Sequence, residues 1–575
     1  MANSLSHRLS RWLPAWLQHY RRDQATQDGI AGLVVTVLLV PQSLAYAMLA
    51  GLPPHVGMYA SILPLLAYAA FGSSMTLAVG PVAVASLMTA SALAPFAAQG
   101  SPEYLSLAIL LAMLGGLQLL VMGALRLGFV ANLLSHSVVS GFVTGSALLI
   151  AIGQLKPLLG VPTQGHTAVE LLLSLLASFQ KLQPATAALG LSAVLLLWSA
   201  RRFLAALLAR CGLAPRAADL LGKLAPMAIV LLSIAAVAFW QLDTRHGVAV
   251  VGTIPQGLPS LQLAWPAREQ VLQLFLPAFV IALVGFVESV SVAQSLAIKR
   301  GQRIDPNAEL RGLGAGNLAS ALSGGFPVTG GFARSVVNFA AGAQTPLAGV
   351  ISAALMSLVL LGMTGLFERL PLAVLAATIM VAVLGLIDLA TPRHAWHYDR
   401  ADALAWAGTA VGVLGLGVEA GIGIGVALSA GTFLWRASRP HIAVLGRLAG
   451  TEHFRNEQRF QVQTQPHLLI MRIDENLFFA NSAAVLDRVE AELARRPDTR
   501  DLLLVLSSVS HIDLTAAEAL ERLRADLQVR GIVLHLAEVK GPVLDRLRHA
   551  GRLRGLAHEP FVSVHAATQA LARNS

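Results

Sequence analysis

The sequence predicts a polytopic α-helical membrane protein followed by a soluble α/β domain. Between Asp28 and Glu103 there is no Lys, Arg, Asp or Glu. Such a stretch can cross a bilayer about three times, because one helix needs about 20 apolar residues. Only 13% of the chain is charged, whereas a soluble domain averages about 25%. The charges concentrate at the end, where residues 441–575 hold 17 basic and 16 acidic side chains.

The chain begins with residues 1–28, which we expect to form a cytoplasmic segment at the membrane surface. This segment holds Trp12, Trp16 and several arginines but no continuous apolar core, so it lacks the pattern of a signal peptide. Basic residues mark the cytoplasmic side of membrane proteins. The net charge of +10 has the same explanation and does not indicate a nucleic-acid partner.

Residues 29–437 form the predicted transmembrane domain, with about 14 segments. An even number of segments would leave both termini in the cytoplasm, as the basic N-terminus and the charged C-terminal domain suggest. Long apolar runs lie near 29–49, 55–72, 105–125, 133–152, 186–200, 224–241, 271–298, 346–362, 371–390, 402–418 and 421–435. Shorter runs interrupted by Gly or Pro lie near 78–92, 307–322 and 331–343.

Two segments rich in Gly and Pro, 77–86 and 324–335, lie one in each half of this domain. Each reads as an extended stretch followed by a short helix. Broken helices at membrane depth are tolerated only against protein or a water-filled cavity, and such pairs indicate an inverted-repeat transporter with a site at the midplane. A helix N-terminus offers free N–H groups and partial positive charge, which suits an anion. The alternative is that these residues only kink packed helices.

Two isolated charges accompany the broken segments. Glu288 lies within the apolar run 275–296, and Arg334 is the only charge between Arg311 and Glu368. A charge at the bilayer centre costs on the order of 2.5–3.5 kcal/mol on insertion scales and therefore indicates function. We expect Arg334 to supply fixed positive charge, and Glu288 to bind a proton or a cation, because water exclusion favours a neutral carboxyl group. The alternative is an ion pair between them that only holds the fold.

Taken together and in order, these features resemble the sulfate permease (SulP) family of anion transporters along nearly the whole chain. The motifs are Pro41-Gln42 with Ala45-Tyr46-Ala47, Gly51-Leu52-Pro53-Pro54, Tyr59-Ala60-Ser61, Phe71-Gly72-Ser73-Ser74 with Val79-Gly80-Pro81-Val82, Ser140-Gly141-Phe142 with Gln154-Leu155-Lys156, Glu288-Ser289, Phe332-Ala333-Arg334-Ser335 with Asn338, and Ala341-Gly342-Ala343-Gln344-Thr345-Pro346. The resemblance implies a 7+7 inverted repeat divided into core and gate domains, usually in a dimer, with a cytoplasmic C-terminal STAS domain.

The resemblance also implies the position of the site. It places the anion between the half-helices that start at Gly80-Pro81 and near Phe332-Ala333. Proton-coupled members carry a Glu on the eighth segment, which implies that Glu288 is the coupling residue. A sodium-coupled branch carries Asp there and Thr one turn on, where this chain has Val292, whose side chain offers no oxygen. This difference weakens the sodium interpretation but leaves it open, since backbone carbonyls can contribute ligands. The implied substrate-binding residues are Gln42, Tyr46, Val82, Ala83, Phe332, Ala333, Arg334 and Ser335.

The C-terminal part, residues 441–575, supports the resemblance independently. It alternates apolar strands with helical stretches, which is typical of an α/β domain. Asp513 or Thr515 is a natural helix N-cap. Thr515 also resembles the residue that is phosphorylated in anti-sigma-factor antagonists, so phosphorylation is a second interpretation. Strands are predicted at Leu468–Ile473, Asp501–Ser507, Gly531–Ala537 and Pro560–Val562, and helices at Ser482–Leu493, Ala516–Leu527 and Pro542–Ala550.

Several other chemistries are not indicated. The single Cys211 excludes an internal disulfide. His394, His397 and Asp399 have a metal-like spacing, but they lack a fourth ligand, so we expect no metal site. The chain has no Walker motif and no Ser-His-Asp or paired-carboxylate arrangement. We therefore expect neither a cofactor nor an enzyme.

The sequence thus predicts secondary active transport of a small anion across the bacterial inner membrane. Sulfate is the default substrate, and proton symport is the default coupling. Bicarbonate, a C4-dicarboxylate or chloride is the alternative cargo, by symport or exchange. An alternative from another class is a membrane sensor that reports anion binding through the STAS domain to a cytoplasmic partner. The expected assembly is a homodimer.

Overall fold

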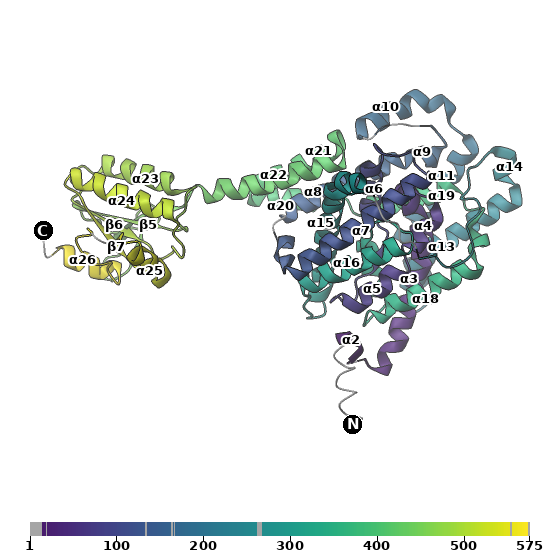
Figure 1. Cartoon of the computed structure of the whole chain (residues 1–575), viewed down its shortest axis with the longest axis horizontal. Coiled ribbons are helices and arrows are strands. Elements are labelled where there is room, and N and C mark those ends of the chain that lie inside the picture. The colour runs from purple at the N-terminus through teal and green to yellow at the C-terminus, as the bar shows by residue number, and fades with distance from the viewer. Residues whose placement is uncertain are drawn as a thin grey trace. The chain divides into compact units, whose positions relative to one another are not determined.

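The computed structural model describes residues 14–18, 20–132, 135–162, 165, 167–261, 267–552 and 555–572. The chain forms two compact units, Met1–Ser429 and Ala430–Ser575 (Figure 1). Half of the predicted N-terminal segment, including Trp12, lies outside the described residues. Trp16 lies on the short helix α2 (Ala15–Gln18), where its indole nitrogen donates a hydrogen bond to the Ala69 carbonyl at 2.7 Å.

The first unit is helical. Within the described ranges, eight helices are long and apolar enough to cross a membrane, judged by length and composition, and α6, α18 and α19 are shorter apolar helices. Grouped at their breaks, the helices before residue 241 make seven segments: α3 (Arg22–Leu49), α4 (Pro54–Tyr59) with α5 (Leu63–Phe71), α6 (Ala83–Leu93), α7 (Pro102–Ala124), α8 (His136–Gly153) with α9 (Leu155–Leu159), α11 (Pro184–Ser199) with α12 (Ala205–Arg210), and α13 (Pro215–Trp240).

The helices after residue 267 can be grouped in the same way into seven more segments; that about 14 of them cross the membrane stays a prediction. They are α15 (Arg268–Ile298), α16 (Pro306–Leu322), α17 (Phe332–Ala340), α18 (Leu347–Gly362), α19 (Leu372–Leu384), α21 (Arg400–Leu416) and α22 (Val418–Ala437). Connecting helices are α10 (Ala168–Ser178), α14 (Leu242–His246) and α20 (Ala390–Tyr398). Helix α3 begins at Arg22, before the predicted apolar run at 29, so the polar residues that precede this run are helical as well.

The two groups of seven meet at a short pair of strands. Strand β1 (Val79–Gly80) pairs antiparallel with β2 (Thr329–Gly330), Val79 opposite Gly330 and Gly80 opposite Thr329. Each strand immediately precedes a short helix, α6 or α17. Both Gly- and Pro-rich segments therefore have the predicted form of an extended stretch followed by a half-helix, and the strand pair brings them together.

Close packing between the two groups depends on small residues. Helix α7 crosses α16 at Gly116 and Gly314, where a Cβ atom on either glycine would lie 2.9 Å from the other's carbonyl oxygen. Only glycine fits at such a crossing, and small residues are the usual way that membrane helices approach closely. This contact fixes α16 beside α7 and so helps to hold the backbone that leads into β2.

The second unit is a five-stranded mixed sheet with helices on its faces. The strand order is β4-β3-β5-β6-β7, in which β3 is antiparallel to both neighbours and β5, β6 and β7 are parallel. Alternate residues of β5 face opposite ways, so Leu469 and Met471 join one apolar core while Leu468 and Ile470 join the other. The elements are β3 (Ile442–Arg447), β4 (Phe454–Asn456), β5 (Leu468–Ile473), α23 (Ser482–Arg495), β6 (Asp501–Val505), α24 (Leu514–Val529), β7 (Val533–Ala537), α25 (Gly541–His549) and α26 (Val564–Ala572).

The predicted strands of this unit are correct at three of four places. The fourth, Pro560–Val562, makes only an isolated bridge from Phe561 to Ala537. Strands β3 and β4 were not predicted, because β3 follows the last membrane helix almost directly and β4 has only three residues. Asp513, not Thr515, is the N-cap of α24, since its carboxylate accepts the Ala516 N–H at 2.8 Å. Thr515 is exposed, and its phosphorylation stays a prediction.

The division into two units leads to a prediction about truncation. A chain that ends at Pro440 should insert in the membrane, remain monodisperse and bind the same anion as the full chain, because all the candidate site residues precede that point. Size-exclusion chromatography and anion titration against the full-length protein in the same detergent provide the measurement. A well-folded truncation that binds no anion would show that the site extends beyond the first unit.

Candidate functional site

The candidate site lies where the two half-helices α6 and α17 begin. Their N-cap residues, Val82 and Gly331, make no side-chain capping hydrogen bond. By contrast, Ser101 and Ser135 cap α7 and α8 through their hydroxyl groups. The first N–H groups of a helix have no partner within it. The starts of both half-helices therefore present free donors and the positive ends of their dipoles.

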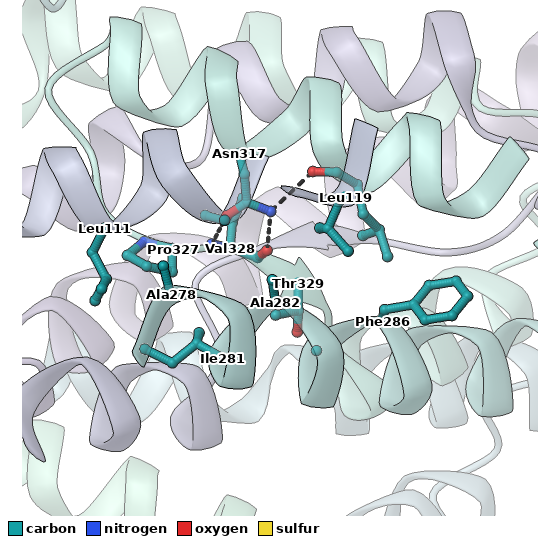
Figure 2. A pocket seen from close by; sticks show the side chains of 13 residues that line it. Leu111, Leu119, Ala278, Ile281, Ala282, Phe286, Asn317, Pro327, Val328 and Thr329 are labelled. Carbon is teal, nitrogen blue, oxygen red and sulfur yellow. Dashed lines mark hydrogen bonds between the residues drawn. The ribbon is translucent and has the colours of Figure 1, made fainter. Parts of the chain in front are cut away.

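Side chains on α15 and α16 hold the backbone that leads into α17. Figure 2 shows the Asn317 amide directed at Val328, from which it accepts the N–H at 3.0 Å and to whose carbonyl it donates at 2.8 Å. One residue after Glu288, the Ser289 hydroxyl accepts the Gly330 N–H at 2.8 Å. These bonds replace the partners that an unbroken helix would have supplied, as buried backbone groups require.

The segment before β1 is tied to α17 in the same way. The Asn338 side chain donates to the Thr76 carbonyl at 3.0 Å. The Ser335 hydroxyl accepts the Ala78 N–H at 2.9 Å and donates to the Gly331 carbonyl at 2.7 Å. The hydroxyl of the predicted site residue Ser335 thus links the two broken segments through Ala78, and Ser335 is not among the residues that line the cavity described below.

A cavity of about 440 Å³, including the part open to solvent, lies in front of the half-helices. It brings together Glu288 and every predicted substrate-binding residue except Ser335. The residues that line it are Gln42, Tyr46, Val82, Ala83, Val84, Glu288, Gly331, Phe332, Ala333, Arg334, Ala382, Val383 and Leu386. Residues more than 250 positions apart in sequence thus meet in one hollow.

The guanidinium of Arg334 is the most unusual group in this cavity. The side chain is only 3% exposed, yet neither Nη1 nor Nη2 has a hydrogen-bond partner among the described residues. It lies against the backbone of both broken segments, since a Cβ on Gly80 or on Gly331 would come within 3.0 Å of its nitrogens. A buried, unpaired cation is costly, and a bound anion would supply the missing partner.

Glu288 does not neutralise Arg334. No ion pair joins them in the part of the chain that the structure describes, so the structure does not support the alternative in which the two only hold the fold. Instead, the half-buried Glu288 faces the cavity and also a second, apolar hollow of about 390 Å³. No donor to its carboxylate is found within the described ranges.

Sequence reasoning did not predict one side of the cavity. This side, the apolar wall, consists of Ala382, Val383 and Leu386 from α19 and the turn after it. Apolar residues in an apolar helix carry no local signal that would mark them. All the polar groups come from the other walls, so an anion would touch this one only through apolar contacts.

The structure gives no support for a metal site. In the described residues, no group of three or more His, Cys, Asp or Glu side chains could hold a metal ion. Val292, which stands one turn after Glu288, is buried in the apolar core. Its side chain cannot ligate sodium, as the sequence indicated.

Comparisons with known proteins identify the family and its two domains. The sulfate permease family model matches residues 26–409, and the STAS domain model matches residues 459–567. The probable sulfate transporter 4.2 of Arabidopsis thaliana is 35% identical over 570 residues, which cover 96% of this chain and 82% of that protein. A probable sulfate transporter of Mycobacterium tuberculosis is 36% identical over 567 residues, which cover 98% of both.

Two solved structures are similar in fold. The murine Solute Carrier 26 family member A9 anion transporter, in its inward-facing state, matches with a TM-score of 0.87 at 23% identity and covers 99% of this chain and 95% of its own. The transmembrane domain of the cyanobacterial bicarbonate transporter BicA matches with a TM-score of 0.59 at 26% identity, over 70% of this chain and 98% of its own. The fold is therefore a helical membrane core followed by a STAS domain.

The contact between Gly331 and Arg334 generates a prediction. Gly331→Ala would place a methyl group 3.0 Å from Nε and Nη2 of Arg334, and such overpacking typically costs about 1–3 kcal/mol. We expect the guanidinium to shift and anion affinity to fall by roughly 5- to 150-fold, as measured by anion titration of the purified protein. Gly349→Ala is the matched control, because its Cβ would meet only a Leu65 methyl group at 3.6 Å. Parent-like affinity in Gly331→Ala would show that the position of the guanidinium does not matter.

Proposed function

The chain belongs to the sulfate permease family of anion transporters, and we propose that it carries sulfate across the membrane together with protons. The observation that supports this proposal best is the unpaired guanidinium of Arg334 beside two uncapped half-helices. Three positive features converge on one cavity, and none has a protein anion as its partner among the described residues. A small anion would complete all three.

Sulfate is proposed over other anions for two reasons. Sequence relatives at about 35% identity over more than 90% of this chain carry the name sulfate transporter. In addition, a tetrahedral dianion has enough oxygens to accept from Arg334 and from the N–H groups at both helix starts at once. The neighbouring side chains are mostly small and apolar, so bicarbonate, a C4-dicarboxylate and chloride remain the competing substrates.

The proposal of proton coupling depends on which acids of the membrane domain accept hydrogen bonds from the protein. Asp28 accepts three hydrogen bonds, from the Gln344 N–H and from the Thr345 N–H and hydroxyl. Glu309 accepts four. The oxygens of both carboxylates are therefore already engaged by backbone and hydroxyl donors. Glu288 has no such donor and faces the cavity, which makes it the candidate for proton uptake.

Protonation of Glu288 would remove a negative charge from the wall of the anion cavity. Anion and proton would then favour each other's binding by equal factors, since linkage is reciprocal. This is the property that a symporter needs. Alternating access would follow if α19, which carries the apolar wall, moves relative to the helices that carry the polar residues of the cavity. A homodimer, an inner-membrane location with cytoplasmic termini, and a cytoplasmic partner of the STAS domain remain predictions.

Removal of the fixed charge provides the first test. Arg334→Ala should cost on the order of 1.5–3 kcal/mol of anion interaction, which corresponds to about 10- to 150-fold weaker binding. Sulfate titration and uptake of labelled sulfate into proteoliposomes provide the measurement. Arg245→Ala is the control, because Arg245 is exposed and remote from the cavity.

The same assay separates the alternatives. A panel of sulfate, bicarbonate, fumarate and chloride, with and without pH and sodium gradients, identifies the cargo. Binding without uptake would indicate a sensor instead of a transporter. If Arg334→Ala binds and transports every anion of the panel like the parent, the guanidinium is structural and the proposed site is wrong.

Glu288→Gln tests the coupling, because it imitates the protonated acid. We expect the variant to keep sulfate binding but to lose acceleration of uptake by an inward proton gradient, while anion exchange persists. Glu269→Gln, at the exposed start of the same helix, should behave as the parent. A parent driven by sodium without dependence on the pH gradient, or a Glu288→Gln variant still driven by protons, would contradict proton symport through Glu288.

A further inference from the structure

We propose that Glu309, which does not line the cavity, is a positioning residue for the anion site. Through the segment 73–78 it sets the place where the half-helix α6 begins. This inference rests on the proposed function, because it concerns the geometry of the same anion site. It assigns a role to a buried carboxylate that the sequence did not single out and that transport does not otherwise require.

Glu309 lies in the first turn of α16 and is completely buried. One carboxylate oxygen accepts three hydrogen bonds from the start of the segment: the Ser73 N–H at 2.9 Å, the Ser73 hydroxyl at 2.6 Å and the Ser74 N–H at 2.9 Å. The other oxygen accepts the Tyr68 hydroxyl at 2.7 Å. A single residue of the second repeat therefore fixes the chain where α5 of the first repeat ends.

The bonds continue from this anchor toward the site. The Ser74 hydroxyl accepts the Leu77 N–H at 3.2 Å, while Asn338 and Ser335 on α17 bind Thr76 and Ala78. Strand β1 and the start of α6 follow directly. The segment 73–78 is thus held by Glu309 at its beginning and by α17 at its end, and it makes no helix of its own.

The second half-helix has a matching anchor. Asp28 on α3 is also completely buried and binds the loop at Gln344 and Thr345, which follows α17. Each repeat therefore supplies one buried carboxylate, and this carboxylate accepts hydrogen bonds from a loop next to the half-helix of the other repeat. A carboxylate suits this task because one oxygen can accept several N–H and O–H groups at once, whereas an apolar side chain would leave them unpaired.

Two substitutions distinguish the role of Glu309 as a hydrogen-bond acceptor from the effect of its charge. In Glu309→Gln the amide oxygen can still accept the three donors of Ser73 and Ser74, and the amide nitrogen can donate to the Tyr68 oxygen. In Glu309→Leu all the donors lose their partner. We therefore expect Glu309→Gln to keep sulfate affinity within about threefold of the parent, and Glu309→Leu to weaken it by at least tenfold.

Two further variants keep the test decisive if Glu309→Leu does not fold. Ser74→Ala removes one hydroxyl from the path toward α6. Ser106→Ala is the matched control, because it removes an exposed hydroxyl that donates to the Pro102 carbonyl of its own helix, α7. Full-length proteins are compared by sulfate titration, by KM and kcat of uptake, and by melting temperature without anion. We expect Ser74→Ala to raise KM and the dissociation constant about tenfold, and Ser106→Ala to leave both unchanged.

A purely structural role would lower the melting temperature of these variants without changing their affinity. The positioning role is therefore overturned if Ser74→Ala, and Glu309→Leu where it folds, bind sulfate as the parent does. Arg334→Ala, measured in parallel, separates this failure from failure of the proposed function. If only Arg334→Ala loses binding, the anion site stands and the anchor is wrong; if Arg334→Ala also binds normally, the proposed site itself is wrong.

Discussion

A buried guanidinium without a protein counter-ion is the constraint on which the membrane domain depends. Arg334 is 3% exposed, both of its terminal nitrogens lack partners among the described residues, and it lies beside the uncapped starts of α6 and α17. Such a charge is tolerated only where an anion or water can reach it. The structure therefore needs a cavity at this point, and the glycines at 80 and 331 leave the guanidinium the space beside the backbone that it requires.

Breaking two helices inside a membrane exposes backbone groups that must be satisfied elsewhere. The chain solves this with short polar side chains on neighbouring helices. Asn317 (Figure 2) and Ser289 hold the backbone before α17. Ser335 and Asn338 join the other broken segment to α17. These residues carry no charge and touch no substrate in our proposal. Their hydrogen bonds hold the extended backbone before each half-helix, so that the chain does not continue there as regular helix.

Asp28, Glu288 and Glu309, three acids of the membrane domain, differ in how many hydrogen-bond donors surround their carboxylates, and this difference separates their roles. Asp28 and Glu309 are surrounded by N–H and O–H groups, so they serve as fixed anchors between the repeats. Glu288 has no such donors and faces two hollows. The same chemical group thus binds backbone in two places and lies beside the cavity in the third, where we propose that it takes up a proton.

Much of this protein follows from local features of its sequence. Charge-free apolar runs predict the membrane segments, paired Gly and Pro breaks predict the half-helices, and isolation within apolar sequence marks Glu288 and Arg334, because each signal lies within a few turns of chain. Only the tertiary structure decided that these two charges do not pair, that Ser335 joins backbone instead of lining the cavity, and that Val383 on α19 lines that cavity. It also showed that Glu309 accepts a hydrogen bond from Ser73, which lies 236 positions away in the sequence. These outcomes depend on side-chain direction and on contacts between distant segments, which local pattern does not encode.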